Sequence, residues 1–401
     1  MTAAPAPDYD RFLVHPYPGP PRNPKEDWKY NFGTVLPGVD LLPLPLLAES
    51  AKQAILEEGH LLSYYPPDQG PEPARQFIAR RMKLDREIDV TAEELLLTNG
   101  SNEAIRTVLD TLIAPGDVIV TEQNLYLGSL RNFRQWGAEV VGVATDANGM
   151  QPEALEATLA DLQRQGKRPK FIYTIPTFQN PEGTVLAANR RKAMLALAQR
   201  FDTLIFEDDC YVHENIDAEV PPAIASLPGA KEWVMYCATF SKILGPGVRL
   251  GWMTAPQRLL DTFSTRKVSG GNNFLVPMIV CRYLEQHWDA RVQELKGILK
   301  GRRDAMIGAL DEHFGEQVTL VTPRGGMFLW AALPEGVDTL ALMNKVSAAG
   351  VRYNPGTQFS PAGAAKNYIR LAFAFCDERT IREGIGELAR VLYREGVLRR
   401  M

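Results

Sequence analysis

Between residues 115 and 260 the sequence alternates between short apolar segments and longer helix-like segments. Strands are indicated at 117–121, 139–143, 171–175, 203–206 and 233–237, and helices at 128–136, 152–165 and 189–201. Strands that alternate with helices in this way form a mainly parallel sheet that helices cover on both faces. We therefore predict an α/β fold.

The regions on either side of this core differ from it. Residues 1–29 are rich in proline and charge, which favours an extended amino-terminal arm. Past a helical stretch at 288–313, strand-like segments at 318–321, 327–330 and 368–375 and helices near 338–349 and 378–395 predict a smaller α+β domain. We expect a large domain over 30–290, whose first segment contributes to the small domain and to dimer contacts, and a small carboxy-terminal domain over 291–401.

Charge and composition restrict the partners. The 401 residues carry a formal net charge of −4, so neither nucleic acid nor an anionic membrane is an expected partner. There is no basic, apolar leader at the amino terminus and no run of about 18 apolar residues. The four cysteines and five histidines lack metal-binding spacings. We expect a cytoplasmic, metal-free protein.

A lysine with unusual neighbours lies in residues 238–252, Ala-Thr-Phe-Ser-Lys-Ile-Leu-Gly-Pro-Gly-Val-Arg-Leu-Gly-Trp. Alone, Lys242 is typical of a solvated surface charge. However, Thr239, Ser241 and Arg249 provide two hydroxyls and a cation for one anionic group. The segment thus predicts a phosphate site beside a reactive amine. The cofactor that needs both, together with an acid at its ring nitrogen, is pyridoxal 5'-phosphate (PLP), an electron sink for carbanions.

A suitable acid follows the apolar strand that begins near residue 204, where ligands of open α/β sheets bind. Asp208 is our candidate for the pyridine nitrogen, because a carboxylate there keeps that nitrogen protonated. Tyr211, three residues further on, is a candidate hydrogen-bond partner of the ring oxygen O3'. An acidic cluster that caps a helix is the alternative.

Three loops offer further candidates. Ser101 begins a helix after Gly100, and amides at a helix amino terminus bind phosphate, although a simple helix cap would have the same sequence. Tyr126 could lie flat on a planar ring. Asn180 could donate to O3', although Asn-Pro-x-Gly is also an ordinary turn.

Arg370 interrupts a β-rich run near the carboxyl terminus, and a buried cation needs an anion. A structural salt bridge and a bound substrate carboxylate are both open as explanations. Gly33, in a turn with two glycines, allows the backbone to approach a ligand closely.

In order along residues 30–395, these segments resemble the class I/II aminotransferases, PLP-dependent enzymes of fold type I that include aspartate aminotransferase. They are most similar to the α-aminoadipate/kynurenine aminotransferase branch. Two departures are Thr239, where serine is common, and Cys210, where the branch usually has proline. The resemblance rests on Tyr65 with Gly70, Gly100-Ser101-Asn102, Tyr126, Asn180-Pro-x-Gly183, Asp208-x-x-Tyr211, Ser241-Lys242 with Arg249, and Arg370.

The resemblance implies a large domain with a mostly parallel seven-stranded sheet and an active homodimer with shared active sites. It implies that Lys242 holds PLP as an aldimine and moves the substrate proton. Asp208 is then the partner of the pyridine nitrogen, Tyr211 and Asn180 contact O3', and Tyr126 stacks on the ring.

The resemblance also implies the remaining contacts. Arg370 binds the substrate α-carboxylate with Asn180 and the Gly33 backbone, and Tyr65 reaches the cofactor from the second subunit. The phosphate is held by Gly100, Ser101, Asn102, Thr239, Ser241 and Arg249.

The implied reaction moves an amino group from an α-amino acid to a 2-keto acid in two half-reactions, with pyridoxamine 5'-phosphate as the intermediate cofactor form. Other PLP reactions, such as β-elimination, racemisation or aldol-type cleavage, use the same cofactor residues and stay open. A ligand-sensing domain of winged-helix regulators is a further alternative, which we disfavour because only about 30 residues precede the similar region. The side chain of the substrate is not indicated.

Overall fold

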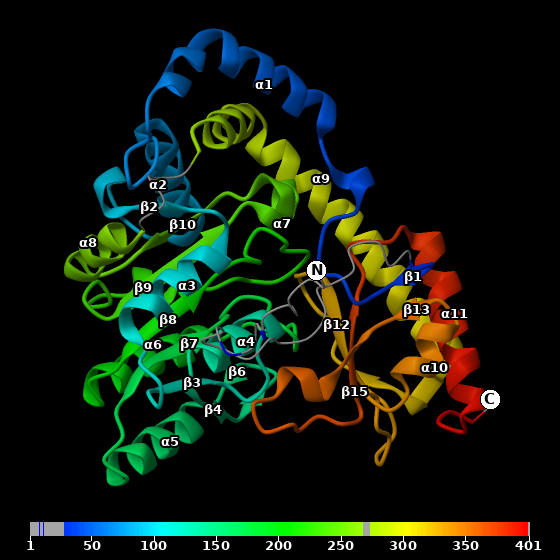
Figure 1. Cartoon of the computed structure of the whole chain (residues 1–401). Coiled ribbons are helices and arrows are strands. Elements are labelled where there is room, and N and C mark those ends of the chain that lie inside the picture. The colour runs from blue at the N-terminus through cyan, green and yellow to red at the C-terminus, as the bar shows by residue number, and fades with distance from the viewer. Residues whose placement is uncertain (1–7, 9–10, 12–27, 268–272, 400–401) are drawn as a thin grey trace, which may run out of the picture.

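A seven-stranded sheet lies at the centre of the larger part of the molecule (Figure 1). The computed structural model describes residues 8, 11, 28–267 and 273–399, so the predicted arm over 1–29 lies almost entirely outside the described residues. β10 runs antiparallel to both neighbours and the other strand pairs are parallel. The strand order is β2 (Leu96–Thr98), β10 (Gly251–Thr254), β9 (Val234–Thr239), β8 (Leu204–Asp208), β7 (Pro169–Thr174), β3 (Val118–Glu122) and β4 (Glu139–Val143).

Helices cover both faces of this sheet, as the sequence pattern predicts. Successive residues of a strand point to opposite faces. On β7, Phe171 and Tyr173 belong to the core beneath α3 and α4, whereas Ile172 belongs to the core beneath α5 and α6. The helices of this part are α2 (Glu72–Arg86), α3 (Ser101–Leu112), α4 (Leu127–Gln135), α5 (Pro152–Arg164), α6 (Ala188–Arg200), α7 (Ser241–Leu244) and α8 (Gln257–Arg266).

A second, four-stranded antiparallel sheet forms the smaller part, on the right of Figure 1. β1 (Tyr30–Asn31) pairs with β13 (Val351–Arg352), so the start of the described chain joins this part. A short β5 (Thr145–Asp146) and β6 (Gly149–Met150) ribbon borders the large sheet. The four-stranded sheet consists of β11 (Thr319–Leu320), β12 (Phe328–Ala332), β15 (Tyr368–Ala372) and β14 (Asn354–Pro355), and its helices are α10 (Met343–Ala348) and α11 (Glu378–Arg394).

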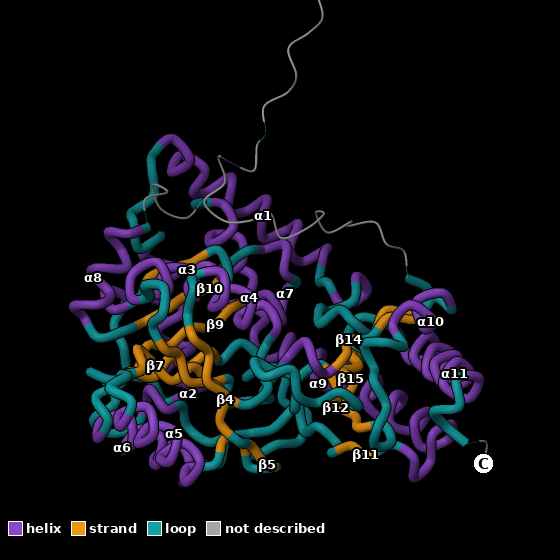
Figure 2. The backbone as a smooth tube through the Cα atoms, turned by 60° about the horizontal axis from the view of Figure 1, so that its bottom comes forward, coloured by secondary structure: helices purple, strands orange, loops and turns teal. Residues whose placement is uncertain are grey.

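One long helix, α9 (Leu275–Phe314), runs along both parts (Figures 1 and 2). Its 40 residues extend about 60 Å at 1.5 Å per residue. It packs against α1 (Leu44–Glu58) in the large part and α11 in the small part. Since α9 continues through residue 290, the division at that position stays a prediction. Among the described residues, none of the helices combines the length and apolarity needed to cross a membrane.

Two predicted helices have different bounds. The helix predicted from 288 begins at Leu275, because the Asn273 side chain accepts from the Val276 amide and Pro277 fits the first turn. The helix predicted over 338–349 is limited to Met343–Ala348, since the Asp338 carboxylate accepts from the amides of the next turn instead.

Candidate functional site

The candidate site lies where β8 and β9 end. Asp208 is the last residue of β8 and Thr239 the last of β9, and α7, which carries Lys242, follows at once. The carboxyl ends of neighbouring parallel strands meet at one edge of a sheet, where ligands of open α/β folds bind. The sequence therefore brings an acid, a hydroxyl and an amine to the same edge.

Lys242 is half-buried, and its amine lacks a carboxylate partner within hydrogen-bond distance among the described residues. Its Nζ donates to the Val35 carbonyl at 2.9 Å and lies 5.5 Å from the centre of the Tyr211 ring. Burial lowers the pKa of Lys242, while the neighbouring Cys210 and Glu214 oppose that shift. A lowered pKa increases the neutral, nucleophilic fraction of the amine.

Asp208 offers one free oxygen. Its Oδ2 accepts from the Tyr173 hydroxyl at 2.7 Å, whereas its buried Oδ1 has no hydrogen-bond partner within the part of the chain that the structure describes. Burial raises the pKa of Asp208 to about 6. A buried acceptor without a donor is costly, so the site suits a ligand that brings its own N–H group. A protonated pyridine nitrogen is such a group.

Arg249 lies against the amino terminus of α3. It adopts a left-handed backbone conformation, with φ of 46°, and donates to the Asn99 carbonyl. A Cβ on Gly100, whose φ is 78°, would come within 2.9 Å of the Arg249 guanidinium, so glycine is required there. The cation and the first amides of α3, beginning at Ser101, therefore lie close enough together to be a candidate site for one anion.

Two hydroxyls complete this candidate phosphate site. Thr239 Oγ1 and Ser241 Oγ are 2.9 Å apart, and Thr239 Oγ1 also accepts from the Ser241 amide at 3.2 Å. The Asn102 side chain accepts from Asn132 Nδ2 at 2.9 Å, and its backbone amide belongs to the first turn of α3. These groups suit a phosphate better than a neutral ligand.

Asn180 connects the cofactor candidates with the substrate candidate. Its Nδ2 donates to the Tyr211 hydroxyl at 2.9 Å, and its Oδ1 accepts from Arg370 Nη1 at 3.1 Å. Tyr126, directly before α4, is 38% exposed, and its hydroxyl is close enough to affect the pKa values of Tyr211 and Arg370. The predicted ring-binding residues thus lie together.

Arg370 is a buried cation on β15 whose hydrogen-bond partners in the described chain are all neutral. Besides Asn180 it donates to the Gly33 carbonyl at 2.8 Å and to Asn354 Oδ1 at 2.9 Å, and its Nε has no partner within the described chain. The rings of Phe359 and, further away, Phe328 lie beside the guanidinium. Burial lowers the pKa of Arg370 to about 10. No structural salt bridge to a described residue satisfies it, which favours a carboxylate ligand.

Tyr65 is a predicted site residue that lies apart from the others. It follows the short 3₁₀ helix at Gly59–Ser63 and is 93% exposed. Within one chain it touches none of the groups described above.

Three residues at the site have no assigned role in the sequence prediction. Tyr173 binds Asp208, Asn354 binds Arg370, and Glu214 is a buried carboxyl that affects Lys242. Tyr173 and Asp208 belong to neighbouring strands, and strand alternation could have placed them on one face. Asn354 comes from a distant strand, and no local pattern reveals it.

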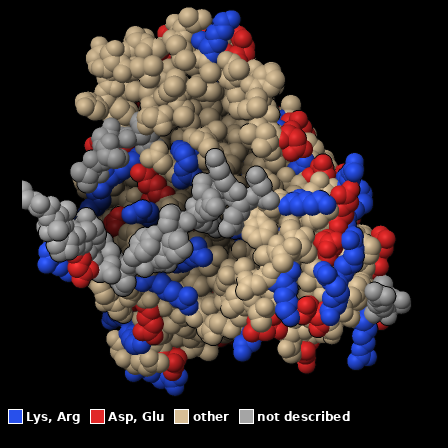
Figure 3. All heavy atoms as spheres, turned by 45° about the vertical axis from the view of Figure 1, so that its right-hand side comes forward, with Lys and Arg blue, Asp and Glu red and all other residues tan. Residues whose placement is uncertain are grey.

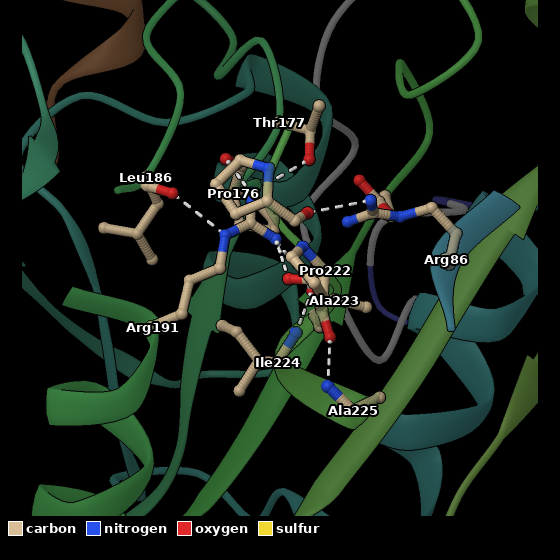
Figure 4. Close-up of polar contacts among 12 residues, drawn as sticks. Arg86, Pro176, Thr177, Leu186, Arg191, Pro222, Ala223, Ile224 and Ala225 are labelled. Carbon is tan, nitrogen blue, oxygen red and sulfur yellow. Dashed lines mark hydrogen bonds and ion pairs between the residues drawn. The ribbon is translucent and has the colours of Figure 1, made fainter. Parts of the chain in front are cut away.

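A buried network of four charged residues fixes the chain around Asp208 (Figure 4). Glu207 and Asp209, the sequence neighbours of Asp208, are both buried. Arg86 donates to Asp209 Oδ2 at 2.6 Å, and Glu207 accepts from the amides of Ile224 and Ala225.

The second arginine of the network is Arg191. Its Nη1 lies 3.7 Å from Glu207 Oε1, and it donates to the carbonyls of Pro176, Leu186 and Pro222. Since Pro176 and Leu186 begin and end the loop that carries Asn180, the network holds that loop against β8 (Figure 4).

Comparison with known proteins agrees with this geometry. The family model for aminotransferase class I and II matches residues 37–388. The aromatic-amino-acid aminotransferase 1 of Thermococcus litoralis is 35% identical over 368 residues, which cover 90% of this chain and 87% of that protein.

Two solved structures are similar along nearly the whole chain. The kynurenine aminotransferase of Pyrococcus horikoshii, solved in complex with PMP, has a TM-score of 0.87 and 31% identity and covers 92% of both chains. The α-aminoadipate aminotransferase of Thermus thermophilus, complexed with N-(5'-phosphopyridoxyl)-L-leucine, has a TM-score of 0.84 and 30% identity over 92% of both chains. This chain belongs to the class I and II aminotransferases, with relatives in the α-aminoadipate and kynurenine branch.

Proposed function

We propose that this aminotransferase moves an amino group from an α-amino acid to a 2-keto acid, with PLP bound at Lys242. The observation that carries the proposal is the set of unsatisfied groups at one sheet edge. Within the described chain, the Asp208 Oδ1 lacks a donor, the Arg370 Nε lacks an acceptor, and the half-buried Lys242 amine contacts a carbonyl and the face of a tyrosine. PLP and an amino-acid carboxylate together supply all the missing partners.

When bound, PLP supplies an electron sink that stabilises negative charge at the substrate α-carbon. Asp208 keeps the ring nitrogen protonated, and Tyr173 holds the carboxylate in place through Oδ2. Tyr211 and Asn180 would hold the ring oxygen, Tyr126 would lie against the ring, and Arg249 and its neighbours would hold the phosphate.

Lys242 carries the proton in this proposal. Once the substrate amine has displaced Lys242 from the cofactor, the freed neutral amine would take the proton from the substrate α-carbon and hold it for return to the product. The Arg370 guanidinium binds the α-carboxylate and so orients the α-hydrogen toward Lys242 Nζ. The Gly33 carbonyl and Asn180 Oδ1 fix the Arg370 side chain before the substrate arrives.

The substrate side chain is a separate question. Arg370 recognises only the carboxylate that all α-amino acids share. The relatives are named for aromatic, kynurenine and α-aminoadipate substrates, so membership of the family leaves the donor to be identified by a panel of amino acids.

We also propose a homodimer in which Tyr65 reaches the phosphate of the partner's site. The dimer is supported by an apolar, exposed surface on α1 and the loop that follows it. This surface includes Leu56, which is 75% exposed, and Tyr65, which is 93% exposed. In Figure 3 the top of the molecule, where α1 lies, carries few charged side chains. Exposed apolar surface of this kind marks association sites.

Borohydride reduction tests the proposal. Reduction of the PLP-loaded protein should fix the cofactor to the peptide that contains Lys242, as mass spectrometry reads it. Lys242→Ala should yield no adduct, while Lys267→Ala, which removes a buried lysine that donates to the Leu97 carbonyl, should keep it. An adduct that persists in Lys242→Ala contradicts the assignment. Product analysis then separates transamination from other PLP reactions, because only transamination aminates the acceptor in equal amount to the keto acid formed.

A further inference from the structure

Asp208 receives its hydrogen bond from a chain of two buried hydroxyls that begins on α4. Ser129 Oγ lies 2.8 Å from the Tyr173 hydroxyl, and that hydroxyl donates to Asp208 Oδ2 at 2.7 Å. Ser129 and Tyr173 are fully buried and Asp208 is 2% exposed, so bulk water does not compete for these bonds. The three side chains come from three different elements, α4, β7 and β8.

The chemistry of the three groups gives this chain a direction. A phenol has one proton and an ionised carboxylate can only accept, so the Tyr173 proton points to Asp208. The Tyr173 oxygen is then the acceptor in the other bond, and Ser129 is its donor. Burial raises the pKa values of both Tyr173 and Asp208, but Ser129 opposes the shift of Tyr173 and Tyr173 opposes that of Asp208.

Packing holds the phenol in this position. The Tyr173 ring meets the rings of Phe133 and Phe206 edge to face, with centroids 5.1 and 5.8 Å away. Phe206 is paired with Tyr173 across β7 and β8, and Asp208 follows on the same face of β8 two residues later. The clamped ring keeps its hydroxyl on Asp208 Oδ2, so Oδ1 is the oxygen left for a ligand.

Burial works against the ionised form of Asp208, and the phenol is its strongest support. Cys210 and Cys237 also favour that form, whereas Asp209 opposes it. Lys242, on α7, interacts favourably with the same carboxylate when it is protonated. However, thiols are weak donors, and a hydrogen bond to a charged group is about twice as strong as one between neutral groups.

We propose that Ser129 and Tyr173 form a relay that keeps Asp208 ionised and leaves its Oδ1 for the cofactor nitrogen. Both are positioning residues that act through Asp208. This inference rests on the proposed function, in which Asp208 is the partner of the pyridine nitrogen, and adds control of the Asp208 charge from α4. Tyr126 lies directly before α4, so the segment proposed to lie against the ring also supports the carboxylate at its nitrogen.

The experiment is a pH titration of Asp208 in the cofactor-free protein. The infrared band of its protonated carboxyl group is followed, and the band is assigned by its loss in Asp208→Asn. Tyr173→Phe keeps the packed ring but removes the donor, so it should raise the midpoint by about one to two pH units. Ser129→Ala removes only the first donor and should raise the midpoint by roughly a few tenths of a unit, because bonds in a chain strengthen one another by about 10–30%.

Tyr236→Phe is the matched control. Tyr236 is also buried, on β9 beside β8, but its hydroxyl donates to Asp209 Oδ2 at 3.4 Å and not to Asp208. The Asp208 midpoint in this variant should equal that of the natural protein. An unchanged midpoint in Tyr173→Phe, or equal shifts in Tyr173→Phe and Tyr236→Phe, overturns the proposal.

Two further outcomes are separable. If Tyr173→Phe does not fold, Ser129→Ala provides the reading, and an unchanged midpoint there overturns the proposal. Nitrogen NMR of the protein loaded with PLP that is isotope-labelled at the ring nitrogen tests the premise, since that nitrogen should be protonated at neutral pH. An unprotonated nitrogen contradicts the proposed function at Asp208, whereas the midpoints of the cofactor-free proteins still decide whether the relay keeps Asp208 ionised.

Discussion

Replacement of Arg191 should destabilise the protein far more than replacement of its neighbour Arg190. Arg191 is 1% exposed and contacts three backbone carbonyls, Thr177 Oγ1 and the Glu207 carboxylate. Arg191→Met keeps the apolar stem but leaves Glu207 with less positive charge nearby and the carbonyls without donors. Removing one partner of a buried ion pair costs about 3–5 kcal/mol.

This cost converts into a shift in melting temperature. At about 2.1 cal/mol/K per residue, unfolding of 401 residues has an entropy of roughly 0.8 kcal/mol/K. Arg191→Met should therefore lower Tm by about 4–6 °C. Because Arg191 ties the ends of the loop that carries Asn180, weaker PLP binding should accompany the loss.

Calorimetry of the cofactor-free proteins measures the effect. Arg190→Met is the matched control, since Arg190 is half-buried and its partner Asp146 is exposed enough for water to solvate it once the arginine is gone, so the pair should contribute about 0–1 kcal/mol. Its Tm should fall by about 1 °C at most. Equal Tm values for the two variants would refute the role assigned to the buried network.

Three further predictions concern the site and the association surface. Because the folded state raises the pKa of Asp208 from 3.8 to about 6, the folded cofactor-free protein binds this proton more tightly than the unfolded chain does, and stability falls as pH rises from about 4 to 6. Asp208→Asn should remove about 2 kcal/mol of that fall, which calorimetry at about pH 4.5 and 6.5 detects as a smaller change in Tm. Arg370→Lys should raise KM for α-amino acids about 10- to 100-fold, since lysine lacks the two-pronged geometry, without weakening the binding of primary amines that lack a carboxylate. Leu56→Glu places a charge on the exposed α1 surface and should shift the mass measured by light scattering from dimer to monomer, while Glu57→Gln, on the same helix, should not.

Much of the fold follows from local sequence patterns. The large sheet is predictable because each strand is an apolar run and each helix follows within a short loop. The start of α9 is not, because Leu275-Val-Pro-Met-Ile-Val280 is apolar on all sides and contains a proline, so no helical periodicity is visible. The short α10 differs from its prediction because the Asp338 side chain competes for the backbone amides.

The residues of the candidate site also fall into two groups: those that local sequence motifs predict, and those that only the folded structure reveals. Lys242, Asp208 and Arg249 lie in ordered motifs, so chemistry and resemblance single them out together. Asn354 and Glu214 become noticeable only when distant segments meet, since the significance of Glu214 is its burial without a partner in the described chain. The spacing of residues along the sequence does not reveal which side chains become buried when distant segments pack together. The role that we propose for Tyr65 depends on a second subunit, which a single chain cannot supply.

The central claim is tested most directly by adding single α-amino acids, without an acceptor, to the PLP-loaded protein while its visible absorbance is recorded. We predict that the band falls for one chemical class of amino acid, that one equivalent of keto acid forms, and that a 2-keto acid restores the band. A band that persists with every amino acid, or one that changes without release of a keto acid, would contradict transamination at Lys242.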